Sequence, residues 1–219
     1  MVPELKICGI TRLEDARYCA AAGADYLGFV QHPESARYIA PSAARDIIDW
    51  VYGPKTVGVF VNRTAAEIND SVEQAGFSIA QLHGDEPPDV CDGVTVPVIK
   101  AVRVGDGFNA GGLDAFLRRY RDVADYFLFD TRVDGLWGGS GVTFDWDIAT
   151  ALSDDVPVFL AGGIRASNVE EAIRRVSPHG IDVSSGLESS PGIKDFEKID
   201  AFFDVFHRVR TNQNESAGR

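Results

Sequence analysis

Two residues that can move protons follow short apolar runs in this sequence. Cys8 comes after Leu5-Lys6-Ile7, and Asp130 comes after Phe127-Leu128-Phe129. A carboxylic acid and a thiolate can together serve general acid–base catalysis, since one donates a proton and the other accepts one. A lone Asp more often closes a strand as a turn residue, and a lone Cys is more often a small buried hydrophobe. The choice between a catalytic and a structural role therefore depends on which residues stand at the ends of the other strands.

Two later apolar runs end in turns that suit an anion. Gly162-Gly163 follows one run, and Ser184-Ser185-Gly186 follows the next. Glycine allows backbone N–H groups to approach an anion, and serine hydroxyls add further donors. In barrels of alternating strands and helices, phosphate sites commonly form after strands seven and eight. We therefore predict phosphate binding by these five residues.

Four further positions allow two interpretations each. Lys6 lies one strand period before Cys8 and either stabilises a thiolate or is solvated. Arg37 either clamps a carboxylate through paired N–H donors or, as is commoner for a loop arginine, is solvated. His83 either assists proton transfer or hydrogen-bonds its loop, and we favour the loop. The segment 138–141, with Gly139 and Gly141, is either a cover over a ligand or a linker.

Runs typical of strands alternate with segments of helical composition along the whole chain. The expected strands are Glu4–Cys8, Asp25–Val30, Lys55–Val61, Phe77–Leu82, Val96–Val102, Tyr126–Phe129, Val156–Leu160 and Ile181–Val183. The expected helices are Leu13–Ala22, Pro41–Val51, Thr64–Ala75 with a capping box from Thr64 to Glu67, Pro87–Cys91, Leu113–Arg121, Trp146–Leu152, Asn168–Val176 and Ile193–Val209.

Such alternation requires parallel strands joined by crossover helices. Eight units within 219 residues favour a closed (β/α)8 TIM barrel of the α/β class over an open sheet. No linker or shift in composition divides the chain. We therefore expect one barrel domain over residues 1–210 and a polar, frayed tail over residues 211–219. The carboxyl ends of strands one and six would then face each other, with Cys8 and Asp130 across the mouth.

Composition excludes several classes of partner. A net charge of −12 argues against nucleic acid. No apolar run approaches the roughly 18 residues that a membrane span needs. The first residues lack the pattern of a secretory signal, and the three cysteines stand far apart without metal-ligand spacing. No His/Glu cluster of metal-ligand type is present. We expect a cytoplasmic protein without a metal.

The charged residues are unusually distributed. Asp outnumbers Glu by 22 to 11, and Arg outnumbers Lys by 16 to 5. Such a surface stays soluble in concentrated salt, where screening weakens the repulsion between its carboxylates. The composition suggests a salt-adapted source, and the alternative is an ordinary acidic cytosolic enzyme.

Several stretches together carry a family resemblance. They are Lys6–Thr11, Ser35–Ile39, Val57–Asn62, Gln81–Gly84, Asp130 through Gly138–Gly141 to Trp146, Leu160–Gly163, Asp182–Glu188 and Ser190–Asp195. In combination they resemble the phosphoribosylanthranilate isomerases of tryptophan biosynthesis, and the likeness covers nearly the whole chain. Ala36 stands where that family frequently has proline, and Ser140 where it frequently has threonine, so the shapes of these two loops stay open.

The resemblance implies a single barrel with no cofactor and no metal, as a monomer or homodimer. It implies an Amadori rearrangement of N-(5-phosphoribosyl)anthranilate to 1-(2-carboxyphenylamino)-1-deoxyribulose 5-phosphate, with Cys8 as general base and Asp130 as general acid. Arg37 would contact the anthranilate part, and the turns after strands seven and eight would hold the phosphate. The other residues expected to bind substrate are Lys6, His83, Gly139 and Gly141.

Two alternatives remain from the sequence. The related isomerase of histidine biosynthesis performs the same rearrangement on another aminoribotide, but it has a carboxylate where Cys8 stands. A non-catalytic phosphosugar-binding protein would also have this barrel. The presence of Cys8, Asp130 and Arg37 together argues against the second alternative.

Overall fold

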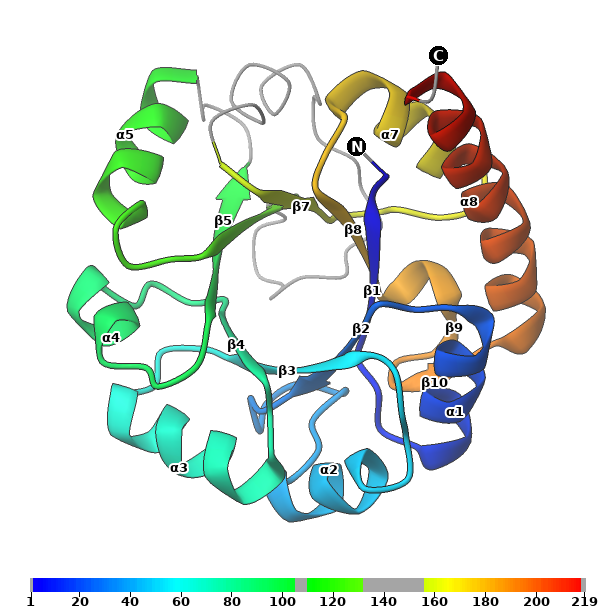
Figure 1. The fold of residues 1–219 in the computed structure, drawn as a ribbon. Coiled ribbons are helices and arrows are strands. Elements are labelled where there is room, and N and C mark those ends of the chain that lie inside the picture. Colours follow the sequence, from blue (N-terminus) through cyan, green and yellow to red (C-terminus); the bar gives the residue numbers. More distant parts are fainter. Residues whose placement is uncertain (1, 105–109, 132–155, 218–219) are drawn as a thin grey trace.

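The computed structural model describes residues 2–104, 110–131 and 156–217, and these form a closed parallel barrel (Figure 1). The strands pair in chain order, and the last pairs with the first. They are β1 (Glu4–Cys8), β2 (Tyr26–Val30), β3 (Lys55–Phe60), β4 (Ile79–Leu82), β5 (Val98–Val104), β6 (Tyr126–Thr131), β7 (Val158–Leu160) and β8 (Gly180–Val183). The predicted TIM barrel is confirmed.

The helices surround the barrel on its outside (Figure 1). They are α1 (Leu13–Ala22), α2 (Pro41–Ile48), α3 (Ala65–Ala75), α4 (Pro88–Asp92), α5 (Ala110–Tyr120), α7 (Val169–Val176) and α8 (Phe196–Ala217). The helix expected at Trp146–Leu152 lies outside the described residues. Within the described ranges, no helix combines the length and the apolar character that crossing a membrane requires.

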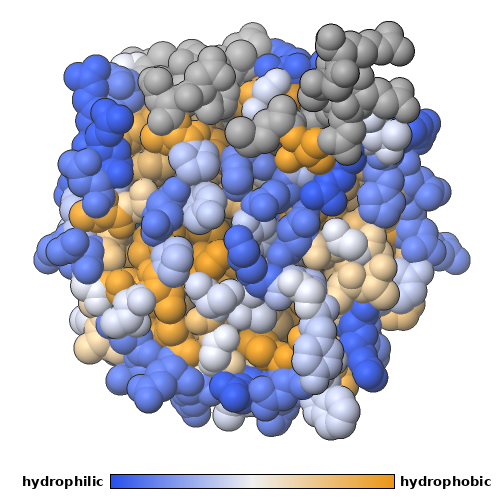
Figure 2. Space-filling model, in the orientation of Figure 1, coloured by the Kyte–Doolittle hydropathy of each residue, from blue (hydrophilic) through white to orange (hydrophobic). Residues whose placement is uncertain are grey.

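Alternation along the strands produces two apolar layers. Side chains on one face of the strands fill the barrel, among them Tyr26, Leu128 and Phe159. Side chains on the other face pack against the helices, for example Phe29 and Leu160. Hydrophilic side chains gather around the edge of the face drawn in Figure 2, with hydrophobic ones between them. The parallel strands are thus covered on both faces, as such sheets require.

Local signals explain most helix ends. The predicted capping box is present in α3, where the Thr64 hydroxyl accepts from the Glu67 N–H and the Glu67 carboxylate accepts from the Thr64 N–H. Helix α1 ends at Gly23, whose φ of 104° is left-handed and suits glycine. Other boundaries shift by a few residues from those expected.

The C-terminal segment differs most from expectation. Residues 193 and 194, expected to begin the last helix, form β10 (Ile193–Lys194), which pairs with β9 (Glu188–Ser190). Helix α8 starts only at Phe196, where the Asp195 carboxylate accepts from two backbone N–H groups. It continues to Ala217, beyond the expected end at Val209, because no glycine or proline interrupts residues 210–217. Residues 211–217 of the expected tail are therefore helical.

Candidate active site

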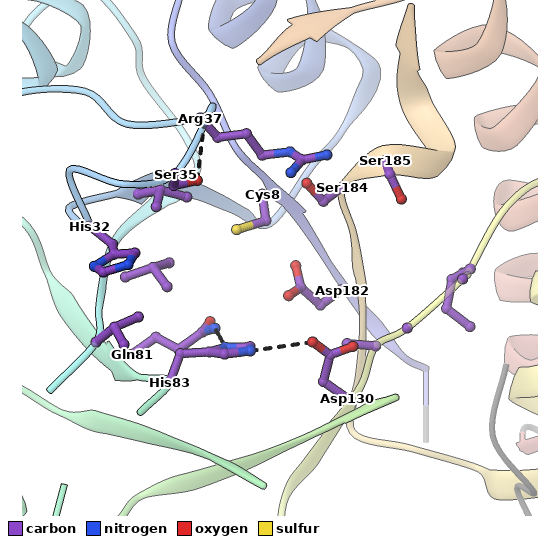
Figure 3. Close-up of a pocket in the computed structure, with 17 residues that line it drawn as sticks. Cys8, His32, Ser35, Arg37, Gln81, His83, Asp130, Asp182, Ser184 and Ser185 are labelled. Atoms are coloured by element: carbon purple, nitrogen blue, oxygen red, sulfur yellow. Dashed lines mark hydrogen bonds and ion pairs between the residues drawn. The ribbon is translucent and has the colours of Figure 1, made fainter. Parts of the chain in front are cut away.

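A pocket opens at the carboxyl ends of the strands. Its lining comes from β1, from the segment between β2 and α2, and from the ends of β3, β4, β6, β7 and β8. The lining residues that carry functional groups are Cys8, His32, Ser35, Arg37, Gln81, His83, Asp130, Asp182, Ser184 and Ser185 (Figure 3). Cys8 and Asp130 thus share one pocket, as the barrel order predicts.

The thiol of Cys8 lies beside a buried ion pair. The Lys6 ammonium is fully buried and lies 2.9 Å from Oδ1 of Asp182. A Cβ atom at Gly28 would lie 2.8 Å from the Cys8 sulfur and 3.2 Å from the Lys6 nitrogen, so both groups use the space that glycine leaves open. Lys6 therefore lies close to the thiol at the bottom of the site.

Burial sets the protonation of this cluster. It raises the pKa of the Cys8 thiol, and although the charges of Lys6 and Lys194 act in the opposite direction, the pKa stays raised. Burial alone would lower the pKa of Lys6, but the adjacent Asp182 and Cys8 outweigh it and raise that pKa. The free protein therefore holds a neutral thiol next to a charged ammonium at neutral pH.

Asp130, at the end of β6, is nearly buried and faces an imidazole. Nε2 of His83 lies 3.3 Å from Oδ2 of Asp130, and Nδ1 of His83 lies 2.8 Å from Nε2 of Gln81 (Figure 3). If the Gln81 amide donates to Nδ1, the imidazole carries its proton on Nε2, directed at Asp130. His83 thus contacts the carboxyl group, a different arrangement from the loop hydrogen bond that we favoured.

Arg37 extends from the segment after β2 into the pocket. Its loop is tied to β2 by the hydrogen bond from Ile39 N–H to the Val30 carbonyl, and its own N–H donates to the Ser35 hydroxyl. The guanidinium Nε and Nη2 donate to the two carboxylate oxygens of Glu188 at 2.9 Å and 2.6 Å. This pairing raises the pKa of Arg37, so the side chain stays charged.

The two turns predicted to bind phosphate are adjacent. Gly162 and Gly163 have φ of 83° and 65°, left-handed values that glycine adopts without strain. After β8, Ser185–Leu187 forms one turn of 3₁₀ helix, and a Cβ atom at Gly186 would lie 2.1 Å from the Ile164 carbonyl oxygen. Only glycine therefore allows the two loops to approach this closely.

Comparison with known proteins decides the family. The family described as "N-(5'phosphoribosyl)anthranilate (PRA) isomerase" matches residues 5–205. This chain belongs to it. The N-(5'-phosphoribosyl)anthranilate isomerase of Geobacter sulfurreducens is 48% identical over 200 residues, covering 90% of this chain and 95% of that protein. The isomerase of Pseudomonas syringae pv. syringae is 46% identical over 206 residues, covering 92% and 96%.

Solved structures of phosphoribosylanthranilate isomerases have the same fold. The enzyme from Thermus thermophilus matches with a TM-score of 0.84 and 38% identity over 94% of this chain and 99% of that one. A phosphoribosylanthranilate isomerase in complex with reduced 1-(o-carboxyphenylamino)-1-deoxyribulose 5-phosphate matches with a TM-score of 0.82 and 37% identity, covering 94% and 98%.

Most of the residues predicted for this isomerase site line the pocket, but some do not. The pocket lining includes Cys8, Arg37, His83, Asp130, Gly162, Gly163, Ser184 and Ser185. Lys6 is instead buried behind the thiol, and Gly186 packs against the loop after β7. Gly139 and Gly141 lie outside the described residues. Among the described residues, no group of His, Cys, Asp and Glu is arranged to hold a metal ion.

Six polar residues in or beside the pocket were not predicted as site residues from the sequence, namely His32, Ser35, Gln81, Asp182, Glu188 and Lys194. Asp182, Gln81, Glu188 and Lys194 are all buried. A signal existed for Asp182 and Gln81, because a polar residue within an otherwise apolar strand needs a buried partner. Glu188 and Lys194 stand in the short strands β9 and β10, which are too short for any periodicity to mark them.

Proposed function

We propose that Cys8 is the general base and Asp130 the general acid of this phosphoribosylanthranilate isomerase. The enzyme converts N-(5'-phosphoribosyl)anthranilate to 1-(2-carboxyphenylamino)-1-deoxyribulose 5-phosphate in tryptophan biosynthesis. The observation that supports these roles is that the thiol and the carboxyl group line one pocket from β1 and β6, three places apart in the ring. A sugar held between them is accessible to both.

The acid acts first in this scheme. Asp130 in its protonated form gives a proton to the ring oxygen of the aminoribose, the ring opens, and an iminium ion results. The His83 imidazole, with Nε2 3.3 Å from Oδ2 of Asp130, lies beside the carboxyl group and restricts its orientation. Their burial keeps this proton from exchanging freely with solvent during the step.

The base acts on the iminium ion. Cys8 as a thiolate removes the proton from C2, giving an enolamine that then ketonises. Because burial raises the pKa of Cys8, the thiolate is scarce, but each thiolate is a stronger base than an ordinary one. The positive charge of Lys6 favours its formation.

Binding is assigned to groups remote from the reacting carbons. The phosphate is held by backbone N–H groups and hydroxyls at Gly162, Gly163, Ser184 and Ser185, and the anthranilate part is contacted by Arg37. Such contacts supply binding energy that orients the sugar between acid and base. His83 lines the same pocket, and Lys6 acts from behind Cys8.

A fluorescence assay of substrate turnover tests the assignment. We expect Cys8→Ala and Asp130→Asn each to lower kcat by about 10²- to 10⁴-fold, the usual contribution of a general acid or base, with little change in KM. Cys8→Ser, which keeps the volume but is a far weaker acid, should also be severely impaired. A Cys8→Ala enzyme with near-normal turnover would contradict the base assignment, because a core cysteine tolerates that change.

We also propose a cytoplasmic location and either a monomer or a homodimer. All three cysteines are free and buried, which suits a reducing compartment. The related isomerase of Thermotoga maritima is described as dimeric. Light scattering of the purified protein distinguishes the two states by molar mass, and fractionation of the source cells tests the location.

A further inference from the structure

The carboxylate of Glu188 is shared by two cations at the edge of the pocket. Arg37 donates to both of its oxygens, and Nζ of Lys194 lies 3.1 Å from Oε1. The side chains of Glu188 and Lys194 are 4% and 0% exposed, and that of Arg37 is 17% exposed. The three charges sum to +1, so a net positive charge faces the pocket at Arg37.

Lys194 links this group to the ends of two strands. Its ammonium donates to the carbonyl oxygen of Cys8 at 2.6 Å and to that of Ser184 at 3.3 Å. Because each buried donor has an acceptor, the position of the ammonium is fully determined by the barrel. Lys194 therefore fixes Glu188 relative to both the thiol and the phosphate turn.

The aliphatic part of Arg37 is held as closely as its charged end. Gly9 has a φ of 81°, and a Cβ atom there would lie 2.7 Å from Cδ of Arg37 and 3.2 Å from Oε1 of Glu188. The aliphatic part of Arg37 thus lies directly against the backbone at Gly9, the residue after Cys8. Glycine at this position is required both by its conformation and by this contact.

The pairing leaves one edge of the guanidinium for a ligand. Glu188 takes the edge formed by Nε and Nη2, and the end formed by Nη1 and Nη2 has the fork geometry that matches a second carboxylate. We propose that Glu188 is a positioning residue, which holds Arg37 by one edge so that the other edge receives the ring carboxylate of the anthranilate part. This inference rests on the proposed function, in which Arg37 contacts that part.

Both partners of Glu188 are needed for this role. Burial alone would raise the pKa of Glu188, but hydrogen bonds from Arg37 and the charge of Lys194 outweigh burial and lower it. Glu188 is therefore ionised whenever the enzyme works. Without Lys194, the single negative charge of Glu188 would neutralise Arg37 and weaken its attraction for the substrate carboxylate.

Binding of two ligands to four proteins tests the proposal. The ligands are reduced 1-(o-carboxyphenylamino)-1-deoxyribulose 5-phosphate and its counterpart without the ring carboxylate. The proteins are wild type, Glu188→Gln, Arg37→Ala and the double variant, measured by calorimetry. We expect Glu188→Gln to weaken the carboxylate-bearing ligand about tenfold and the other ligand less than about twofold. In the Arg37→Ala background, Glu188→Gln should add no further loss.

Other results would overturn the proposal. Equal weakening of both ligands would indicate a merely structural Glu188, and losses that multiply in the double variant would show that Glu188 acts independently of Arg37. Glu197→Gln, an exposed change on α8, is the matched control and should bind both ligands as wild type does. A wild-type protein that fails to turn over the phosphoribosyl substrate would instead contradict the proposed function.

A second variant keeps the test valid if Glu188→Gln does not fold. Glu188→Asp retains the negative charge between the two cations but is one methylene shorter, so it cannot span both Arg37 nitrogens as well. We expect it to show a smaller loss that again depends on the ring carboxylate. Loss independent of that carboxylate would contradict the positioning role.

Discussion

The ammonium nitrogen of Lys6 lies 2.9 Å from Oδ1 of Asp182, its register partner on the neighbouring strand. Both charges act on the Cys8 thiol, in opposite directions: Lys6 lowers its pKa and Asp182 raises it, while burial, the largest influence, raises it. The reactivity of the thiol therefore depends on a pair of charges that does not itself need to touch the substrate.

Replacing Lys6 with methionine should make the thiol less reactive. Lys6→Met removes the positive charge and raises the pKa of Cys8 further, so we expect turnover and the rate of Cys8 alkylation at pH 8 to fall at least about tenfold, as for one pKa unit. Iodoacetamide labelling followed by mass spectrometry measures the thiol directly. Cys19 and Cys91 contribute little because their pKa values are raised to about 12 and about 11 by burial.

Replacing Asp182 with asparagine should have the opposite effect on the reactivity of Cys8. Asp182→Asn removes the negative charge, lowers the pKa of the thiol and should accelerate its alkylation relative to wild type. It also leaves the buried Lys6 ammonium without its carboxylate, which typically costs about 3–5 kcal/mol of stability, measurable by urea unfolding. Identical alkylation profiles in Lys6→Met, Asp182→Asn and wild type would show that these charges do not act on Cys8.

The rate of Cys8 alkylation should still be rising with pH in the neutral range. Iodoacetamide reacts with the thiolate, so the labelling rate rises with pH through the pKa of Cys8. Because burial raises this pKa above the ordinary value of 9.0, the rise should continue across the neutral range instead of levelling there. In kcat/KM the same rise is opposed by the requirement for a protonated acid, so the thiol is best measured directly. Labelling rates in overlapping buffers measure it, and a rate that is flat from about pH 6 to pH 8 would contradict a raised pKa of Cys8.

The adjacent turns after β7 and β8 should bind inorganic phosphate. We expect crystals grown with phosphate or sulfate to show the anion against the backbone at Gly162-Gly163 and Ser184-Ser185. Phosphate should inhibit competitively, and Ser184→Ala should weaken this inhibition several-fold because a hydroxyl donor is lost. Ser189→Ala, an exposed change in β9, is the control. An anion bound only elsewhere would contradict the site.

Molar potassium chloride should stabilise the protein. The net charge of −12 makes the folded chain repel itself, and salt screens that repulsion. Salt also weakens surface pairs such as Arg45–Asp49 and Arg63–Glu67, but exposed pairs of this kind contribute little to stability. We therefore expect the thermal midpoint to rise from dilute buffer to molar salt. A flat or falling midpoint would leave the Asp and Arg excess without this explanation.

The sequence was sufficient for the barrel because each strand and helix carries its own pattern. Apolar runs with abrupt polar ends identify β1 and β6, and the capping box at Thr64 marks the start of α3. The same local signals were misleading at Ile193–Lys194, which resemble the first turn of the following helix. Their pairing with β9 depends on a partner strand that no local pattern reveals.

The site could be predicted as a set of strand ends but not as a set of contacts. Lys6 meets Asp182 across a sequence separation of 176 residues, and Arg37 meets Glu188 across 151. These distances become short only when β8 pairs with β1. For the same reason, the sequence left open whether Lys6 is solvated, and it did not predict that His83 lies beside Asp130.

Pairing of β1 with β8 also means that the active site is assembled from two segments that lie far apart in the sequence. Cys8 and Gly9 are synthesised long before Asp182, Ser184 and Glu188. A nascent or truncated chain that lacks β8 and the residues after it has the thiol without the partner of Lys6, the serine turn or the residue that holds Arg37. Catalytic competence therefore arises only once β8 has docked beside β1.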